Sequence, residues 1–189
     1  MAKQLVKGEK IVLNKIENIF NNITLNITCE STLQKSYDID TFLFMFEESS
    51  RIHKKGIVFY NNPESICKSI QFREYNDETI KKITFEVNLN GIPKNITKLI
   101  LGGSVFKNKS NPSSDSNSAS LNISLAAVNR ITQTEIFSLD VKCDIASNDA
   151  FILGEVYKHT TFWKFNAIDY SLSSDLLGSV KTVYNAGFY

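Results

Sequence analysis

Hydrophobic and polar residues alternate along several short stretches of this chain. The alternation runs over residues 23–29 (Ile-Thr-Leu-Asn-Ile-Thr-Cys) and recurs over 83–90 and 121–125. Because successive side chains of a β-strand point to opposite faces, an alternating stretch places its apolar residues on one face. Each of these stretches therefore predicts a strand with one packed face and one solvated face.

Other stretches are apolar at consecutive positions, namely 41–46 (Thr-Phe-Leu-Phe-Met-Phe), 57–60 and 151–153. Such runs are typical of central strands that are covered on both faces. The chain shows many short strands divided by polar turns, and it lacks the regular strand–helix rhythm of a doubly wound nucleotide-binding fold. The sequence thus predicts an all-β protein built as a β-sandwich of two sheets.

One amphipathic helix is predicted near the C-terminus, where apolar residues recur at helical spacing. These residues are Leu172, Leu176, Leu177, Val180, Val183 and Tyr184. Ser173 or Ser174 is suited to cap the start of the helix, and Gly187 is suited to follow its end. We expect the apolar stripe to pack on the sandwich. A helix that binds a partner protein is the alternative.

The segment 107–118 (Lys-Asn-Lys-Ser-Asn-Pro-Ser-Ser-Asp-Ser-Asn-Ser) is the most polar part of the chain. It offers no side chain to a hydrophobic core, so we expect a mobile surface loop. The loop lies between two predicted strands, which makes it an insertion rather than a linker. Residues 1–189 are therefore expected to form a single domain.

Charge and cysteine content narrow the class of protein. The 21 Lys and Arg residues nearly balance the 20 Asp and Glu residues, leaving a net charge of +1. This balance argues against a nucleic-acid partner and against a polybasic membrane address. No stretch approaches the roughly 18 apolar residues of a transmembrane helix, and residues 1–10 lack the apolar region of a signal peptide. Cys29, Cys67 and Cys143 are odd in number and far apart, unlike a disulfide framework, so we expect a cytoplasmic protein.

Asp38 and Asp40 are the strongest candidates for metal ligands. Their spacing puts both carboxylates on one side of a strand, and two carboxylates held close together repel each other and attract a cation. Calcium takes roughly six to eight oxygen ligands, so the pair needs further donors. The best additional donors in the sequence are Asn61, Asp77 and Glu78. Solvated carboxylates at a strand edge are the alternative interpretation of so short a pattern.

Several motifs occur in order along the chain. They are Leu-Val-Lys-Gly at 5–8, Tyr-Asp-Ile-Asp at 37–40, Val-Phe-Tyr-Asn at 58–61, Leu-Gly-Glu-Val-Tyr-Lys at 153–158 and Trp-Lys-Phe at 163–165. In this order and spacing they resemble the TerD family of tellurium-resistance and stress proteins over nearly the whole chain. The resemblance implies a bacterial, non-enzymatic β-sandwich that holds calcium in Asp-rich loops. It also implies an assembly with other Ter-type stress proteins, with peripheral association at the inner face of the membrane.

The chain departs from the TerD pattern in its acidic residues. Ser36 stands at the first acidic position of the family's Asp-Phe-Asp-Leu-Asp run. The later Gly/Asp-rich loop is shortened to residues 73–78, and residues 29–31 (Cys-Glu-Ser) stand where the family has Gly-Trp-Asp. Each loss removes candidate oxygen ligands, so we expect calcium to bind more weakly than is normal for the family.

The function that the resemblance implies is a tellurite-resistance or general stress-response protein that binds calcium. A metal-independent scaffold for protein–protein contacts is the alternative, and a phosphoester hydrolase with its metal at Asp38 and Asp40 is a third interpretation. An exposed apolar patch would favour the scaffold. A tight ring of carboxylate and amide oxygens would favour calcium. A deep pocket with a perturbed carboxylate would favour the enzyme.

The motif at 153–165 predicts a hairpin that turns at residues 159–162. Trp163 is expected to anchor the core rather than to stack on a ligand. Glu155 lies between apolar neighbours. It fits a buried, hydrogen-bonded carboxylate better than an acid–base group, and both interpretations stay open from sequence alone.

Overall fold

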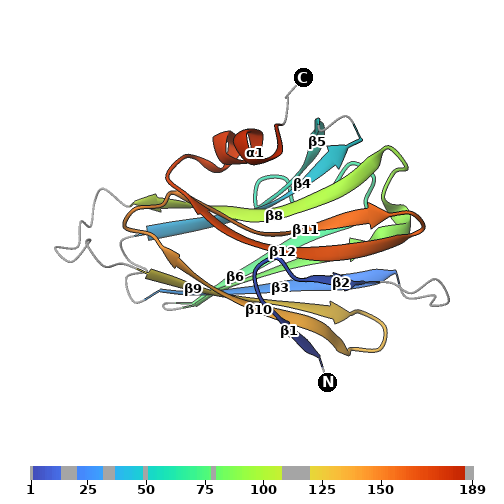
Figure 1. Ribbon diagram of the computed structural model, residues 1–189, viewed down its shortest axis with the longest axis horizontal. Helices are drawn as coiled ribbons and strands as arrows, with labels where there is room; N and C mark the ends of the chain where they lie inside the picture. The colour runs from blue at the N-terminus through green and yellow to red at the C-terminus, as the bar shows by residue number, and fades with distance from the viewer. Residues whose placement is uncertain are drawn as a thin grey trace.

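The computed structural model describes residues 2–13, 21–31, 37–48, 51–77, 80–107 and 120–185. Within these ranges two six-stranded sheets face each other, and a short helix lies on the outside of one of them (Figure 1). The predicted all-β sandwich with a C-terminal helix is confirmed.

The two sheets, called A and B below, use strands from all along the chain. Sheet A has the order β1 (Lys3–Leu5), β10 (Glu135–Asp144), β9 (Ser120–Asn129), β3 (Asn22–Ser31), β7 (Ile80–Asn88) and β6 (Ile70–Asn76). Sheet B has the order β2 (Lys10–Val12), β12 (Phe162–Leu172), β11 (Ala150–His159), β8 (Ile96–Lys107), β4 (Tyr37–Glu47) and β5 (Ile52–Val58). All neighbouring strands are antiparallel except β1 and β10, which are parallel.

The alternating stretches form strands whose apolar residues fill the space between the sheets. On β3 the side chains of Ile23, Leu25, Ile27 and Cys29 are buried, and the same alternation holds on β7 and β9. The stretch 83–90 runs beyond β7 into a short 3-10 turn, η2 (Leu89–Gly91), in which Leu89 is still buried. The period of two therefore predicted these strands correctly.

The consecutive apolar runs have two different outcomes. The runs on β4 and β11 lie inside sheet B, as predicted, and α1 (Leu176–Tyr184) covers most of their outer face. Phe42, at the start of the β4 run, is only partly buried. The run 57–60 was predicted as a central strand, and that prediction is wrong. β5 is the edge strand of sheet B, and Tyr60 lies in the turn after it with 47% of its surface exposed. The position of a strand in a sheet depends on which strands, distant in sequence, pair with it. A local run of apolar residues does not show this.

Helix α1 packs on the sandwich as expected, but its first residues differ from the prediction. Asp175, rather than Ser173 or Ser174, is the N-cap, and its side chain accepts a hydrogen bond from the backbone N–H of Gly178 at 2.8 Å. Leu172 belongs to β12. The helix ends at Tyr184, and its C-cap, Asn185, has a φ of 48° in the left-handed region. Gly187, the predicted residue after the helix, lies outside the described residues.

The motifs at the two ends of the chain have structural roles. Gly8, with a φ of +83°, turns the chain from β1 in sheet A to β2 in sheet B, and its N–H donates to the carbonyl of Ala167 at 2.7 Å. β11 and β12 form the predicted hairpin, with His159 paired to Phe162. Trp163 is buried in the core, as predicted.

The polar segment 107–118 connects the two sheets. β8 of sheet B ends at Lys107 and β9 of sheet A begins at Ser120, so Lys107 is still part of a strand. The rest of the predicted mobile loop lies outside the described residues. In the part of the chain that the structure describes, no helix is long and apolar enough to cross a bilayer.

Candidate functional site

Asp38 and Asp40 lie at an exposed part of sheet B. The alternation of β4 turns Tyr37 and Ile39 toward the core and puts the two carboxylates together on the other side, as their spacing predicted. β5 pairs with β4 only between Leu43 and Phe46, so the start of β4 has β8 on one side and no described strand on the other. This free edge leaves room for a side chain from sheet A to reach the carboxylates.

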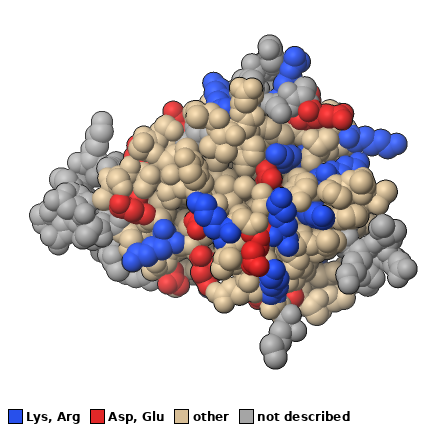
Figure 2. Space-filling model, viewed as in Figure 1, with Lys and Arg blue, Asp and Glu red and all other residues tan. Residues whose placement is uncertain are grey.

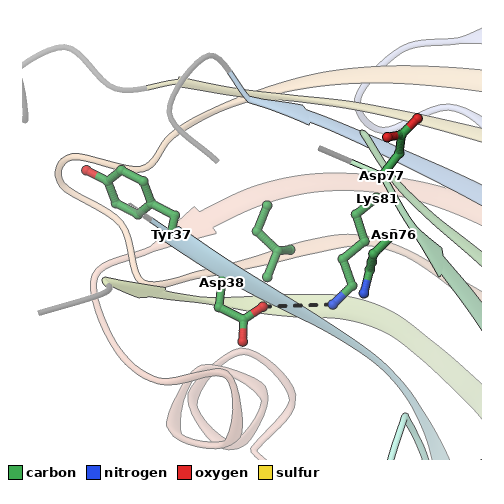
Figure 3. Close-up of a pocket in the computed structure, with 6 residues that line it drawn as sticks. Tyr37, Asp38, Asn76, Asp77 and Lys81 are labelled. Atoms are coloured by element: carbon green, nitrogen blue, oxygen red, sulfur yellow. Dashed lines mark ion pairs between the residues drawn. The ribbon is translucent and has the colours of Figure 1, made fainter. Parts of the chain in front are cut away.

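Lys81 is the side chain that reaches them. It shares the core-facing side of β7 with Ile83, and only 13% of its side chain is exposed. Its Nζ lies 3.3 Å from Glu74 Oε2, 3.8 Å from Asp40 Oδ1 and 4.0 Å from Asp38 Oδ1. Figure 3 shows Lys81 pointing toward Asp38, with their ion pair drawn as a dashed line. We call Asp38, Asp40, Glu74 and Lys81 the Lys81 cluster.

The Lys81 cluster carries more negative than positive charge. When all four groups are ionised, three carboxylates face one ammonium, which leaves a net charge of about −2. Burial raises the pKa of Asp40 above its usual value, and the carboxylates of Asp38 and Glu74 raise it further, while Lys81 opposes the shift. The excess negative charge is the feature of this site that could attract a cation.

A cavity of about 170 Å³ lies beside the cluster and is open to solvent. It is lined by Tyr37, Asp38, Ile39, Asn76, Asp77 and Lys81. In Figure 3 the carboxylate of Asp77 lies on the far side of Lys81 from Asp38 and points away from it. The two aspartates therefore share the cavity wall without converging on one point.

The proposed calcium ligands are only partly brought together. Asp38 and Asp40 share the cluster, and Asp77 lines the adjacent cavity. Asn61 is exposed in the turn after β5 and is not part of the cavity lining. Glu78 lies outside the described residues. Among the residues that the structure describes, no three Asp, Glu, His or Cys side chains are arranged to hold a common metal ion.

Sequence reasoning missed both Glu74 and Lys81, although a signal was present. Lys81 occupies the position before Ile83 on the apolar face of an alternating strand, and Glu74 follows Phe72 in the same way on β6. A charged residue that continues an apolar face is expected to have a buried partner. That the partner lies on the other sheet, at β4, follows only from the fold.

A second feature lies on the outer face of sheet B beside α1. A groove of about 310 Å³ opens there, with a lining that is almost wholly apolar. Its lining residues are Phe42, Phe44, Ile57, Phe59, Ser104, Phe106, Asp175, Leu176 and Leu177. Phe106 is 52% exposed and Leu177 is 40% exposed. We call this feature the α1 groove.

Glu155 is the centre of a half-buried polar cluster under the other end of α1. Its Oε1 accepts a hydrogen bond from Asn166 Nδ2 at 3.1 Å, and its Oε2 forms an ion pair with Lys98 Nζ at 3.0 Å. Lys98 also lies 4.9 Å from the centre of the Tyr184 ring. Burial, followed by the nearby charge of Glu155, raises the pKa of Tyr184. These contacts fit the structural role that the sequence favoured for Glu155.

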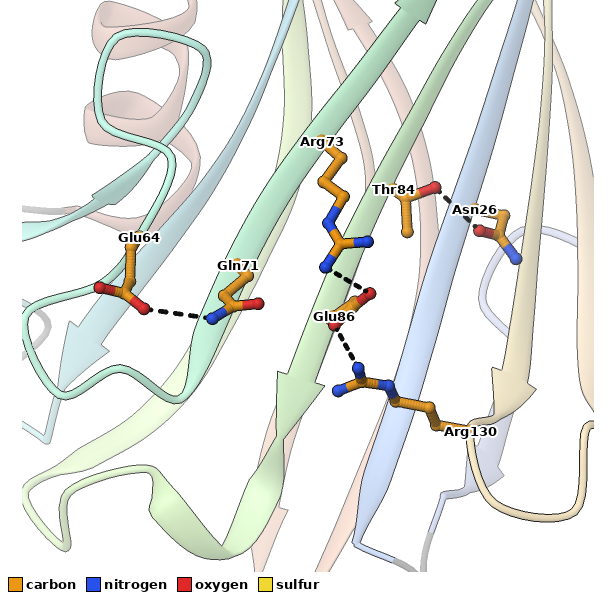
Figure 4. A network of polar contacts seen from close by, with 7 residues as sticks. All are labelled: Asn26, Glu64, Gln71, Arg73, Thr84, Glu86 and Arg130. Atoms are coloured by element: carbon orange, nitrogen blue, oxygen red, sulfur yellow. Dashed lines mark hydrogen bonds and ion pairs between the residues drawn. The ribbon is translucent and has the colours of Figure 1, made fainter.

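The outer face of sheet A is polar. Glu86 forms ion pairs with Arg130 at 2.8 Å and with Arg73 at 3.4 Å, and smaller polar pairs lie on either side of it (Figure 4).

Figure 2 shows acidic and basic side chains interspersed over the visible face of the molecule, without a large patch of one sign. This surface fits the near-zero net charge of the chain.

Known proteins are similar to this chain in sequence, and solved structures are similar to it in fold. The family model described as TerD domain matches residues 1–183. The tellurium resistance protein TerD of Alcaligenes sp is 25% identical over 179 residues, covering 89% of this chain and 90% of that protein. General stress protein 16U of Bacillus subtilis is 25% identical over 180 residues, with the same coverage of both chains.

The solved structures agree at the level of the fold. The crystal structure of a homologue of telluride resistance protein (TerD) from Streptomyces coelicolor superposes with a TM-score of 0.59 at 12% identity, covering 89% of this chain and 99% of that one. A crystal structure of a protein of unknown function gives a TM-score of 0.61 at 13% identity. The family model spans nearly the whole chain, and these structures share its fold. The chain therefore belongs to the TerD family.

Proposed function

We propose that this protein acts in a tellurium-resistance or general stress response as a binding module, and that its binding site for a partner protein is the α1 groove. The observation that carries the proposal is the exposed, aromatic lining of the groove. Relatives named as tellurium resistance and general stress proteins support the kind of response. The cytoplasm is the compartment that we propose for this activity.

The α1 groove exists because α1 is too short to cover the outer face of sheet B. A helix of 9 residues is about 14 Å long, whereas a strand of 11 residues such as β4 extends over about 36 Å. Phe44 and Phe46 are buried under the helix, but no element that the structure describes gives Phe106 such a cover. Phe106 and Leu177 therefore stay in contact with water at the mouth of the groove.

The occupant that we propose is an amphipathic segment of another Ter-type stress protein. Apolar side chains of that segment would bury the aromatic lining, and removing one large apolar side chain from water contributes about 1.5–3 kcal/mol. Among the lining residues that the structure describes, Asp175 is the one with a charged side chain. A basic residue beside the apolar side chains of the partner segment would complement its charge.

A displayed library of random peptides provides the test. Selection on the wild-type protein, with counter-selection on Phe106→Glu, is expected to enrich peptides that combine large apolar residues with a basic residue. Tyr75→Glu is the matched control, because Tyr75 is 63% exposed on β6, away from the groove. Enriched peptides should keep their binding to Tyr75→Glu. The proposal would be contradicted if the enriched peptides bound all three proteins equally. It would also be contradicted if no peptide were enriched and the wild-type protein bound only to anionic vesicles.

Calcium binding at the Lys81 cluster is a second candidate function. The excess of carboxylates over ammonium groups favours it, as does the open cavity that Asp38 shares with Asp77. Calcium requires roughly six to eight oxygen ligands at about 2.3–2.6 Å. The described carboxylates supply few of these, so the proposed affinity is weaker than is normal for the family.

Calorimetric titration of chelator-treated protein tests this candidate. Saturable heat with calcium but not with magnesium, lost in Asp38→Asn, is the expected result. The melting temperature should rise with calcium in parallel, because a ligand that binds only the folded state stabilises it. A flat titration at millimolar calcium would remove calcium binding from the account and leave the α1 groove untouched.

A further inference from the structure

We infer that the ammonium of Lys81 is a built-in cation that joins the two sheets at this end of the sandwich, and that any metal ion must displace it to reach the same carboxylates. The inference concerns a different site from the α1 groove, so it stands whether or not partner binding is confirmed. It also bears on the proposed calcium binding, because calcium could bind these carboxylates only after Lys81 had moved away from them.

The Lys81 cluster links two strands of sheet A to a strand of sheet B. Asp38 and Asp40 belong to β4 in sheet B, whereas Glu74 and Lys81 belong to β6 and β7 in sheet A. The ammonium lies within 4.0 Å of a carboxylate oxygen of each of the three acids. At 3.3–4.0 Å these contacts are ion pairs, through which one ammonium attracts carboxylates of both sheets at once.

Burial makes this arrangement specific. The Lys81 side chain is 13% exposed and that of Asp40 is 16% exposed, so neither charge is fully solvated. A charge removed from water needs an opposite charge close to it, and a partly buried pair is screened by salt less than an exposed one. Without Lys81 the three carboxylates would repel each other across the junction between the sheets.

The distances in the cluster suit an ammonium rather than a metal ion. The carboxylate oxygens stand 3.3–4.0 Å from the nitrogen, whereas calcium holds its oxygen ligands at about 2.3–2.6 Å. A calcium ion bound by the same acids would require them to move inward and the Lys81 side chain to move out. Lys81 therefore competes with calcium for Asp38, Asp40 and Glu74.

The test is the variant Lys81→Met, which keeps much of the aliphatic length and removes the charge. Lys82→Met is the matched control, because Lys82 is the next residue on β7, is exposed and points to the opposite face. With chelator present we expect Lys81→Met to melt at a lower temperature than the wild type and Lys82→Met to be unchanged. Calcium should restore the melting temperature of Lys81→Met and bind it at least about ten-fold more tightly than the wild type.

A second variant keeps the test decisive if Lys81→Met folds poorly. Adding Glu74→Gln to Lys81→Met removes one of the repelling charges, so the double variant should regain part of the lost melting temperature without calcium. If Lys81→Met and Lys82→Met have equal melting temperatures and equal calcium responses, the inference is wrong. A flat calcium titration of the wild type together with binding by Lys81→Met would reject the calcium candidate and support the inference.

Discussion

On the outer face of sheet A, Glu86 of β7 forms ion pairs with Arg73 on the neighbouring strand β6 and with Arg130 in the turn after β9 (Figure 4). On the outer face of sheet B, Phe44 and Phe46 lie under a helix, and Phe106 lies at the mouth of a groove. The first face satisfies its own polar groups and needs no cover. The second face needs a cover, and within the described part of the chain α1 supplies only part of it. An incomplete apolar face is what an interaction surface requires.

The largest effect is expected where α1 covers sheet B. Leu176 is 3% exposed and packs with Phe44 and Ile152 in the outer cluster, so Leu176→Ala should lower the free energy of unfolding by about 2–5 kcal/mol. Leu177, the next residue, is 40% exposed, and Leu177→Ala should change it by less than about 0.5 kcal/mol. Urea unfolding of both variants measures the difference. Equal losses would mean that α1 does not divide into a packed and an open side.

A smaller effect is expected on the polar face of sheet A. Glu86→Gln removes the charge that faces Arg73 and Arg130, while both arginines stay largely solvated, so the loss should be about 1 kcal/mol. The loss should shrink as salt is added, because salt screens exposed charges. Glu64→Gln, which alters a single exposed contact to Gln71, is the control. An effect as large as that of Leu176→Ala would contradict the distinction between the two faces.

Asp40 of the Lys81 cluster predicts that the stability of the folded protein depends on pH with the opposite sign to that expected of an ordinary ion-paired carboxylate. The pKa of Asp40 is raised in the folded state, chiefly by burial, so the folded protein binds its proton more tightly than the unfolded chain does. Between the ordinary pKa and the raised one, stability contributed by this group falls as pH rises. Melting temperature as a function of pH should therefore show a smaller acid-to-neutral decline in Asp40→Asn than in the wild type. A steeper decline in the variant would contradict the assignment.

The smallest effect on stability is expected at the mouth of the α1 groove. Phe106 is 52% exposed, so Phe106→Glu loses little packing, but its carboxylate would lie opposite Asp38 on β4, and this like-charge pair should lower the free energy of unfolding by about 0.5 kcal/mol. The same variant should lose binding of a partner segment. A substitution at Phe106 should therefore weaken partner binding with little loss of stability. A substitution at Leu176 would change both, because Leu176 is buried and also lines the groove. A large loss of stability in Phe106→Glu would show that the residue serves the core instead.

Much of the fold could be predicted from the sequence, because burial leaves a periodic trace. Ile23 to Cys29 alternate on β3 and are buried on one side, and the 41–46 run lies inside sheet B. The edge position of β5 was not predictable, because it depends on which distant strand pairs with β4. Asp175 was missed as the helix cap because two serines precede it and serve that role equally well by type.

The candidate site was less predictable than the fold. The spacing of Asp38 and Asp40 correctly placed their carboxylates on one side of a strand. The identity of the cation beside them was not accessible, because Lys81 is more than 40 residues away and in the other sheet. Calcium binding stays a prediction. The contacts of Lys81 show how to test it, by calcium titration of the wild type and of Lys81→Met.

The most direct test of the proposed function is a calorimetric titration with one peptide enriched on the wild-type protein, carried out in the presence of chelator. We expect saturable binding to the wild type and to Tyr75→Glu, and binding at least about ten-fold weaker to Phe106→Glu. Equal affinity for Phe106→Glu and the wild type would contradict the assignment of the α1 groove as the binding surface.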